Sequence, residues 1–585
     1  MSQVHSTLMR AAVQLKSGQP AQAEPALRRH LRTNPGDPDA NRLLGLALLQ
    51  QGQGPQAEFF AKRATELKAD PANFDVLGAT LMVVQKFADA EKAFAKGCEL
   101  GPQIPSLHYG RGAALMQLED PEAAATCFAR SLQLNPDNPE AAGFYASALQ
   151  NSYRVAESLD TLRRGVARWP QHLRIRHQLA VLCNYVGVPA PETFEHHRVL
   201  GALMDDDARQ AGAGPVRFNV TPEPDRPLRV GLVSPDFREH SVARFVESLV
   251  ANSGDSVTYV AFSAVPKEDA TTARLRKHMP EWHDVRQLSD AKLALLCRQQ
   301  RIDIAIDLTG HTISTRLAAF CHHAAPVQAT AIGYPNTTGL SVINWRVGDA
   351  ITDPAGEPRL ATELTLRVEP CFLCFAPPPE APEIKPREPG PIRFGSFNAL
   401  KKLSPATLEL WSGVLAAVPG SRLVLKAYTL DKPEIRDRVL AALEAAGIPR
   451  DRVDILPPAP TIAAHLAAYH QVDIALDAFP YHGTTTTCEA MWMGVPVVTL
   501  KGDTHASRVG ASLLTASGQA DRIATTPEQF ITIARDLAAD PARLAFLRAG
   551  LRDQMRASPL CDGPAYAKAF EVVLRHAWHA WCVRQ

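Results

Sequence analysis

The sequence predicts an all-helical repeat region followed by two α/β lobes, each built on a doubly wound parallel sheet. Small residues and prolines recur about every 34 residues over roughly the first 200 residues, which is the period of a helix-pair repeat. From Leu228 onward, short apolar runs typical of strands buried on both faces alternate with helical segments. The proline-rich stretch 376–391 separates two such series, so we expect two sheets.

The composition is that of a folded protein without a surplus of charge. The chain has 585 residues, enough for about four domains of roughly 150 residues each. Apolar residues make up 46% and charged residues 21%, which supplies buried cores and excludes a disordered chain. The 62 Lys and Arg residues balance 61 Asp and Glu residues, which argues against a nucleic-acid partner, because such proteins need a basic surplus to neutralise phosphates.

The sequence also argues against a membrane partner and a disulfide framework. It has no run of about 18 uncharged apolar residues, and its first segment lacks the apolar core of a signal peptide, so we expect a cytoplasmic protein. The ten cysteines are too sparse for a framework of disulfides. Only Cys371 and Cys374 form a C-x-x-C pair, which we interpret as two buried thiols in a strand and not as a zinc or redox site.

The repeat region is typical of tetratricopeptide helix pairs. We count five repeats from Val4 to Pro170 and a sixth, weaker pair to about residue 200, and we assign residues 1–204 to this array. Such units bury their apolar faces only against neighbours and stack into a superhelix with a concave surface. The recurring positions are Pro35, Pro71, Pro102, Pro136 and Pro170, then Gly45, Gly78, Gly112, Ala146 and Ala180, and then Ala23, Ala57, Ala90 and Ala124.

A polar segment and two lobes follow the repeats. Residues 205–227 have the composition of a linker or capping segment, and we interpret Asp205–Asp207 as a solvated acidic turn and Asp37–Asp39 as helix caps in a repeat turn. Lobe one is expected over residues 228–385 and lobe two over 386–585, with a ligand cleft at the carboxyl ends of their strands. The expected strands lie in LRVGLVSPDF, TYVAFSAV, IDIAIDLTG and VQATAIGYP, and in IRFGSFNA, RLVLKAY, VDILP, VDIALDAF and VPVVTL.

Several common catalytic motifs are absent from both lobes. Neither lobe carries G-x-G-x-x-G after a strand, and the chain has no G-x-x-x-x-G-K-[ST] and no G-x-S-x-G. A nicotinamide enzyme, a P-loop nucleotidase and a serine hydrolase are therefore disfavoured.

The most informative segment is Leu476–Pro496, in which four threonines open a helix after a strand and a Pro- and Gly-containing loop. Exposed amides and hydroxyls at a helix start form an anion site suited to a diphosphate. Glu489 lies one turn beyond Thr485 on the same face, where a carboxylate can accept hydrogen bonds from ribose hydroxyls. The alternative is a threonine-capped helix with an ordinary surface glutamate.

A lysine follows the first strand of lobe two. Ser404 is the expected N-cap and Pro405 the first helical residue, so residues 398–402 form the turn above that strand. Lys402 in this turn can neutralise charge that develops on a departing phosphate. The alternative is a solvated lysine pair in a loop.

Two histidines lie at strand ends of lobe one. The first strand ends near Ser234 and Ser241 can cap the next helix, so His240 is expected at the edge of the cleft. Its imidazole can act as a base or orient a sugar, and the alternative is a structural histidine at a helix start. His311, in DLTGHT, has an equivalent place and the same two interpretations.

These segments together closely resemble the O-linked N-acetylglucosamine transferase family, in a bacterial form. The resemblance covers nearly the whole chain and is carried by the repeats and by DFREHS, GYPNTTG, FGSFNALKKLSP, HGTTTTCEAMWMGVPVVTL and THASRVGASLL. It implies a GT-B pair of Rossmann-like lobes behind the repeats. It also implies inverting, metal-independent transfer of a sugar from a UDP-sugar such as UDP-GlcNAc to Ser or Thr of proteins held by the tetratricopeptide groove, without a cofactor.

The resemblance also implies roles for individual residues. Lys402 matches the lysine that stabilises the departing uridine diphosphate, and His240 matches an active-site histidine once proposed as the base. His465 matches the histidine that stacks on uracil, and Glu489 falls at a ribose-binding carboxylate. The remaining donor-binding positions are Thr484, Thr485 and Thr486 at the diphosphate and Gly333, Tyr334 and Pro335 near the sugar, with His311 at a neighbouring strand end.

This chain departs from the animal members of the family at several places. Thr484 replaces a histidine, Ala399 replaces a glutamine near the donor, and Ala468 replaces an arginine beside uracil, which puts the donor's identity in question. The asparagines that grip the acceptor backbone are also missing from the repeats. Their places are taken by Leu43, Val76, Gly110 and Phe144.

Three hypotheses remain from the sequence. The first is the protein O-glycosyltransferase described above, and the second is a related N-glucosyltransferase that acts on asparagine. The third is a repeat scaffold that binds nucleotide and partners with little turnover. The presence of Lys402, His240 and the threonine helix favours an enzyme, because a scaffold needs none of them.

Overall fold

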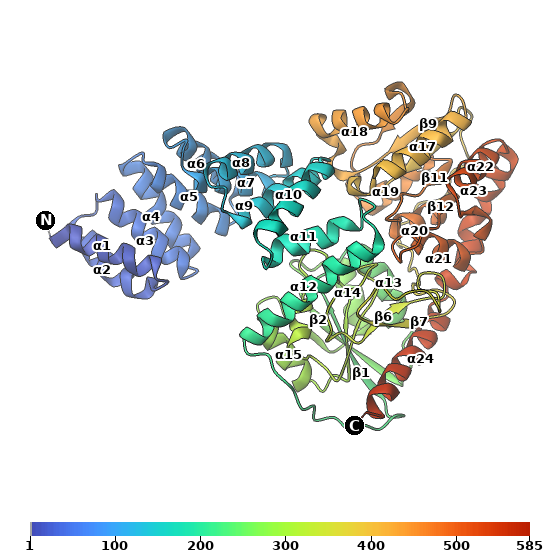
Figure 1. Ribbon diagram of the computed structural model, residues 1–585, viewed down its shortest axis with the longest axis horizontal. Helices are drawn as coiled ribbons and strands as arrows, with labels where there is room; N and C mark the ends of the chain where they lie inside the picture. The colour runs from blue at the N-terminus through green and yellow to red at the C-terminus, as the bar shows by residue number, and fades with distance from the viewer. Residues whose placement is uncertain (1–2, 585) are drawn as a thin grey trace. The chain divides into compact units, whose positions relative to one another are not determined.

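The computed structural model describes residues 3–584, and the chain forms two compact units, Met1–Ile175 and Arg176–Gln585. Figure 1 shows the first as a helical array and the second as two α/β lobes. None of the described helices is long and apolar enough to cross a membrane.

The first unit consists of antiparallel helix pairs whose starts are set by prolines and short polar caps. Pro38, Pro71 and Pro121 occupy the first turn of their helices, where a missing N–H costs no intrahelical hydrogen bond. Asp37 caps its helix through hydrogen bonds from the amides of Asp39 and Ala40, as expected for this turn. The helices are α1 (Gln3–Lys16), α2 (Pro20–Thr33), α3 (Pro38–Gln50), α4 (Gly54–Leu67), α5 (Pro71–Val83), α6 (Phe87–Leu100), α7 (Pro105–Gln117), α8 (Pro121–Leu134), α9 (Pro139–Asn151) and α10 (Val155–Arg168).

The periodic small residues let neighbouring helices approach each other and make room for buried rings. A Cβ on Gly45 would lie 3.2 Å from the backbone nitrogen of Ala61 in the paired helix. A Cβ on Gly78 or Gly110 would lie within 2.7 Å of the Phe94 ring, which is buried. The pattern that predicted tetratricopeptide repeats is therefore the packing pattern of this unit.

Most of the sixth helix pair, from Arg176 onward, belongs to the second unit, although the sequence grouped it with the repeats up to residue 204. It consists of α11 (Leu173–Cys183) and α12 (Ala190–Gln210). The backbone of α12 packs directly against lobe one, because a Cβ on Gly201 would lie 1.9 Å from the Gly339 carbonyl oxygen. Asp205 lies inside α12 and accepts a hydrogen bond from Ser341 Oγ at 3.0 Å, so the expected acidic turn is helical here.

Lobe one is a seven-stranded parallel sheet in the order β3-β2-β1-β4-β5-β6-β7. Most of its central strand residues are fully buried, as the continuous apolar runs predicted. The strands are β1 (Leu228–Ser234), β2 (Val257–Ser263), β3 (Trp282–Asp284), β4 (Ile304–Asp307), β5 (Val327–Thr330), β6 (Trp345–Gly348) and β7 (Leu364–Arg367). The helices are α13 (Ser241–Val250), α14 (Ala270–His278), α15 (Asp290–Gln299) and α16 (Leu317–Cys321).

Lobe two is a six-stranded parallel sheet in the order β10-β9-β8-β11-β12-β13. Its strands are β8 (Arg393–Ser396), β9 (Arg422–Leu425), β10 (Val453–Ile455), β11 (Ile474–Leu476), β12 (Val497–Leu500) and β13 (Ile523–Ala524). Its helices are α17 (Pro405–Ala417), α18 (Pro433–Ala445), α19 (Ile462–Ala467), α20 (Thr485–Trp492), α21 (Val509–Ala516), α22 (Pro527–Ala538) and α23 (Pro541–Arg556). The two sheets are the expected pair of doubly wound lobes.

The last helix, α24 (Gly563–Cys582), returns to lobe one, as Figure 1 shows. Trp578 Nε1 on this helix donates to the Glu223 carbonyl at 2.9 Å. Helix α24, which follows lobe two in the sequence, therefore packs on the segment that leads into β1 of lobe one. Cys371 and Cys374 are buried free thiols, as expected. They lie in an irregular segment between β7 and β8 and not in a strand.

Candidate functional site

The candidate site lies at the carboxyl ends of the strands of lobe two. The turn after β8 holds Lys402, and the loop after β11 leads into the four threonines at the start of α20. Parallel strands β8 and β11 are neighbours in the sheet, so these two segments meet at one edge.

Lys402 closes a short 3-10 turn, Leu400–Lys402, directly before Ser404 caps α17. Its Nζ donates to the carbonyl oxygen of His482 at 2.7 Å and to Asn398 Oδ1 at 3.3 Å. Burial lowers the pKa of Lys402 to about 8, against an opposing effect of Asp477. The alternative of a solvated lysine therefore does not hold for Lys402, since its ammonium group is buried and points at the α20 loop.

The start of α20 has the features of an anion site. Thr484 is the N-cap residue without a side-chain capping bond, and the hydroxyl of Thr485 is buried without a hydrogen-bond partner. Thr486 Oγ1 donates to Asn398 Oδ1 at 3.1 Å, which connects the threonine helix to the Lys402 turn. The first amides of the helix have no intrahelical acceptor. Amides, hydroxyls and one ammonium group thus surround the same place.

Glu489 is buried and forms part of a polar chain that crosses lobe two. His465 Nε2 lies 3.0 Å from Glu489 Oε2, and His465 Nδ1 lies 2.5 Å from Lys426 Nζ. Because the lysine is the donor at Nδ1, the ring carries its proton on Nε2 and donates to the carboxylate. The alternative of an ordinary surface glutamate is wrong, since Glu489 is only 6% exposed.

Lys426 is a site residue that the sequence analysis missed. It follows the last residue of β9, and burial lowers its pKa while Glu489 acts in the opposite direction. Its Nζ also lies 5.4 Å from the centre of the Phe397 ring, which forms an aromatic wall beside His465. Its position at the carboxyl end of a strand was the signal that could have identified it.

His240 lies on lobe one as the N-cap residue of α13, so the histidine takes the capping place expected for Ser241. Its Nδ1 accepts a hydrogen bond from the Val242 amide at 3.3 Å and lies 3.6 Å from Asp236 Oδ1. Burial lowers its pKa, with Asp236 opposing, so the ring is neutral near pH 7. Since Nδ1 accepts from the backbone, the proton of the neutral ring is on Nε2.

His311 and Tyr334 form a buried cluster with two histidines of α11 and α12. His311 donates from Nε2 to the Thr338 carbonyl at 2.7 Å, its Nδ1 is buried without a partner, and burial strongly lowers its pKa. The rings of His177, His197 and Tyr334 lie 5.3 to 5.5 Å from its centre. The structure therefore buries His311 beneath the turn Gly333–Pro335, against the Tyr334 ring.

The turn Gly333–Pro335 is fixed from both sides. A Cβ on Gly333 would lie 2.1 Å from the Leu308 carbonyl oxygen, so only glycine fits this close approach. The Tyr334 hydroxyl accepts from Asn184 Nδ2 at 2.6 Å and lies 2.7 Å from His197 Nε2. Burial lowers the pKa of His197 to about 4, so His197 is neutral and accepts the hydroxyl proton.

Ion pairs join the two lobes beside the site. His505 Nδ1 of lobe two lies 2.7 Å from Asp353 Oδ2 of lobe one, and Arg508 Nη1 lies 2.8 Å from Glu357 Oε2. Although burial acts in the opposite direction, His505 and Arg346 hold the pKa of Asp353 well below its usual range. A cavity of about 850 Å³ opens between these loops and the first turn of α17.

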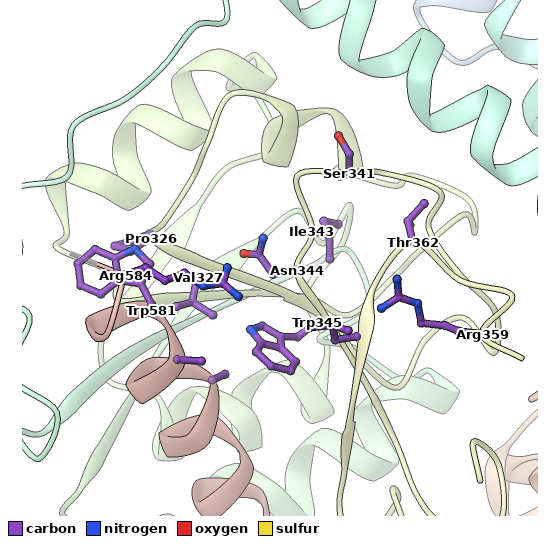
Figure 2. Close-up of a pocket in the computed structure, with 13 residues that line it drawn as sticks. Pro326, Val327, Ser341, Ile343, Asn344, Trp345, Arg359, Thr362, Trp581 and Arg584 are labelled. Carbon is purple, nitrogen blue, oxygen red and sulfur yellow. The ribbon is translucent and has the colours of Figure 1, made fainter. Parts of the chain in front are cut away.

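A smaller cavity of about 300 Å³ lies elsewhere, at the first residues of β5, β6 and β7 and the end of α24. Figure 2 shows Trp345, Trp581 and Arg359 around it. Because it lies at the amino ends of these strands, it is not part of the candidate site.

Comparison with known proteins agrees with this geometry. Residues 212–366 and 388–570 match glycosyl transferase family 41, and residues 14–79 and 105–138 match tetratricopeptide repeats. The chain belongs to glycosyl transferase family 41. This confirms the resemblance seen in the sequence, with repeats ahead of two GT-B lobes.

Named relatives and a solved structure give the same result. The chain is 42% identical over 368 residues to the Arabidopsis thaliana protein named probable UDP-N-acetylglucosamine–peptide N-acetylglucosaminyltransferase SPINDLY, a match that covers 62% of this chain and 40% of that protein. It is 28% identical over 372 residues to the one named SEC from the same plant, a match that covers 61% of this chain and 38% of that protein. A mutant of the Thermobaculum terrenum O-GlcNAc transferase is similar over 100% of this chain and 99% of its own, with 31% identity and a TM-score of 0.66. The match thus spans about 40% of the length of the plant relatives.

Proposed function

We propose that this family 41 protein transfers a sugar from a nucleoside diphosphate donor to Ser or Thr hydroxyls of proteins, with UDP-GlcNAc as the first donor to test. The observation that carries the proposal is the buried Lys402 ammonium group, which faces the start of α20. A buried cation next to unpaired amides and hydroxyls is suited to a leaving group that gains negative charge.

In the proposed mechanism the diphosphate lies at the start of α20 and the ribose lies near Glu489. One Glu489 oxygen is already paired with His465, which leaves the other for sugar hydroxyls. The acceptor oxygen attacks the anomeric carbon, the bond from that carbon to the phosphate oxygen breaks, and the diphosphate leaves with the electron pair. The proton of the acceptor hydroxyl passes to solvent water. Lys402 then acts mainly on rate, because the charge on the diphosphate is largest in the transition state.

His240 fits the role of a hydrogen-bond donor better than that of a base. Its Nδ1 is occupied by the Val242 amide, so Nε2 carries the proton of the neutral ring. In this arrangement Nε2–H can orient the sugar or the acceptor, whereas abstraction of the acceptor proton requires an unprotonated nitrogen.

We propose that no metal ion takes part in the reaction. Lys402 and the α20 amides supply the positive potential that a divalent cation gives to diphosphates in metal-dependent enzymes. The chain has two Asp-x-Asp runs: Asp37–Asp39 lies in a repeat turn where Asp37 caps a helix, and Asp205–Asp207 lies inside α12.

We also propose that acceptor proteins bind along the repeats without an asparagine ladder. Leu43, Val76 and Gly110 are buried between helices, and Phe144 stacks on Phe128 at 5.6 Å. Selection would then rest on shape and on side-chain contacts. A reducing compartment such as the cytoplasm suits the ten free cysteines.

The test is sugar release and transfer with a panel of donors. UDP-GlcNAc, UDP-glucose and a GDP-sugar are each incubated with the protein, with and without lysate proteins as acceptors. Protein-linked sugar that is released by β-elimination supports O-transfer from that donor. Label that resists β-elimination would indicate asparagine linkage, and transfer from the GDP-sugar alone would contradict the uridine donor.

A further inference from the structure

Two stacked tyrosines lie against the lysine turn. Tyr185, in the segment between α11 and α12, stacks on Tyr481, in the loop between β11 and α20, with ring centres 4.3 Å apart and planes at 11°. The Nζ of Lys402 lies 4.7 Å from the centre of the Tyr481 ring, and the Nζ of Lys401 lies 4.5 Å from that of Tyr185. Such distances are those of cation–π contacts.

The segment that carries Tyr185 is held on lobe one. Asn184 donates to the Tyr334 hydroxyl at 2.6 Å, and Asn336 Nδ2 donates to Asn184 Oδ1 at 2.5 Å. Tyr185 itself is buried, with 6% of its surface exposed. Tyr481 belongs to lobe two. The Tyr185–Tyr481 stack is therefore a contact between the lobes, placed directly beside Lys402.

We infer that Tyr185 is a positioning residue, which holds the Tyr481 ring over the Lys402 ammonium group and so fixes the lysine toward the leaving diphosphate. The inference rests on the proposed function of Lys402. Tyr185 comes from neither sheet, so the segment before lobe one supplies part of the environment of the lysine in lobe two. Separation of the lobes would break the stack and leave Lys402 less ordered.

The surroundings of Lys402 explain why one ring matters. The charged groups that face Lys402 are Asp477, which raises its pKa, and Lys401, which lowers it. The other titratable groups beside it are His482 and Tyr481. Its hydrogen-bond partners are the His482 carbonyl and Asn398. The Tyr481 ring, which stacks on Tyr185, covers a further side of the ammonium group. Loss of the Tyr185 ring would let water reach Nζ and restore the pKa toward its ordinary value.

Three variants test the inference. Tyr185→Ala removes the ring, Tyr185→Phe keeps the ring and removes the hydroxyl, and Tyr428→Ala removes a 64% exposed tyrosine of lobe two as a control. We expect Tyr185→Ala to lower kcat on the order of 10-fold or more, with the donor KM changed less than about threefold, because a misplaced group costs rate more than binding. Tyr185→Phe and Tyr428→Ala should stay within about twofold of the parent. Equal losses in Tyr185→Ala and Tyr185→Phe would overturn the role of the ring.

A second readout does not depend on activity. Competitive labelling of Lys402 with acetic anhydride across pH, read by mass spectrometry on folded protein, reports the pKa of its amine. We expect about 8 in the parent and in Tyr185→Phe, and a rise of at least one pH unit in Tyr185→Ala. An unchanged pKa in Tyr185→Ala would overturn the inference, whereas a failure of sugar transfer in the parent would count against the proposed function alone.

Discussion

Replacing Lys402 by alanine should separate turnover from nucleotide binding. The lysine is partly buried and has only neutral oxygens as hydrogen-bond partners, from His482 and Asn398. Burial lowers its pKa from 10.5 to about 8. At about 1.36 kcal/mol per pKa unit, keeping the ammonium charged without a bound diphosphate costs on the order of 3 kcal/mol. Charge on the diphosphate offsets that cost, and it does so most in the transition state.

The expected loss in kcat is about 10²- to 10³-fold, the scale seen when one preorganised donor is removed. The affinity for UDP should fall by less, because the α20 amides and hydroxyls remain. Steady-state kinetics and isothermal titration of UDP measure the two effects. A variant that transfers sugar at the parent rate would refute the role given to Lys402.

The same lysine predicts a dependence on pH. In the free protein Lys402 loses its proton as the pH rises through about 8, and bound diphosphate favours the ammonium. UDP binding near pH 8 to 9 should therefore take up a proton, which titrations in buffers of different ionisation enthalpy detect. Between about pH 8 and 10.5, Lys402 binds more protons in the unfolded chain than in the folded protein. The free energy of unfolding therefore rises with pH over this range, and the destabilising effect of Lys402 disappears. Lys402→Met should accordingly unfold at a higher temperature than the parent at pH 7, and the gain should vanish above about pH 10.5.

Other predictions address the remaining parts of the site. Glu489→Gln removes the charge that pairs with His465 and should weaken UDP binding about 10-fold in titration, since charge-assisted hydrogen bonds are worth about 1.5–3 kcal/mol; unchanged affinity would contradict a role at the ribose. His240→Ala should lower kcat by about 10- to 100-fold in steady-state kinetics, because the Nε2–H donor is lost, and an unchanged kcat would contradict that role. Activity should survive EDTA, and a loss that Mg²⁺ or Mn²⁺ restores would show that a metal is needed. A chain of residues 176–585 should bind UDP but glycosylate lysate proteins poorly, and undiminished transfer would show that the repeats do not present the acceptor. The cut before Arg176 follows the boundary of the second unit and keeps most of α11 and all of α12, which packs on lobe one.

The sequence by itself determined the order of the elements and the local form of most site segments. The 34-residue period predicted the helix pairs, because small residues are required wherever helices approach each other, as at Gly45. Ser404 and Pro405 predicted the start of α17, and the four threonines predicted the start of α20. These signals lie within a few residues of what they specify, so they can be read along the chain.

The tertiary structure decided which of these local features act together. Lys402 and the α20 loop are separated by 80 residues of chain, and they meet only because β8 and β11 are neighbours in one sheet. The pairing of His465 with both Lys426 and Glu489 and the stacking of Tyr185 on Tyr481 likewise join distant segments. The sixth helix pair has the repeat pattern but packs on lobe one. A repeat pattern specifies an apolar helix face, but the tertiary structure decides which surface covers that face. Local patterns fix where helices and strands begin and end, but contacts between distant residues depend on how the finished layers pack, and that packing placed the buried ammonium group beside the helix start.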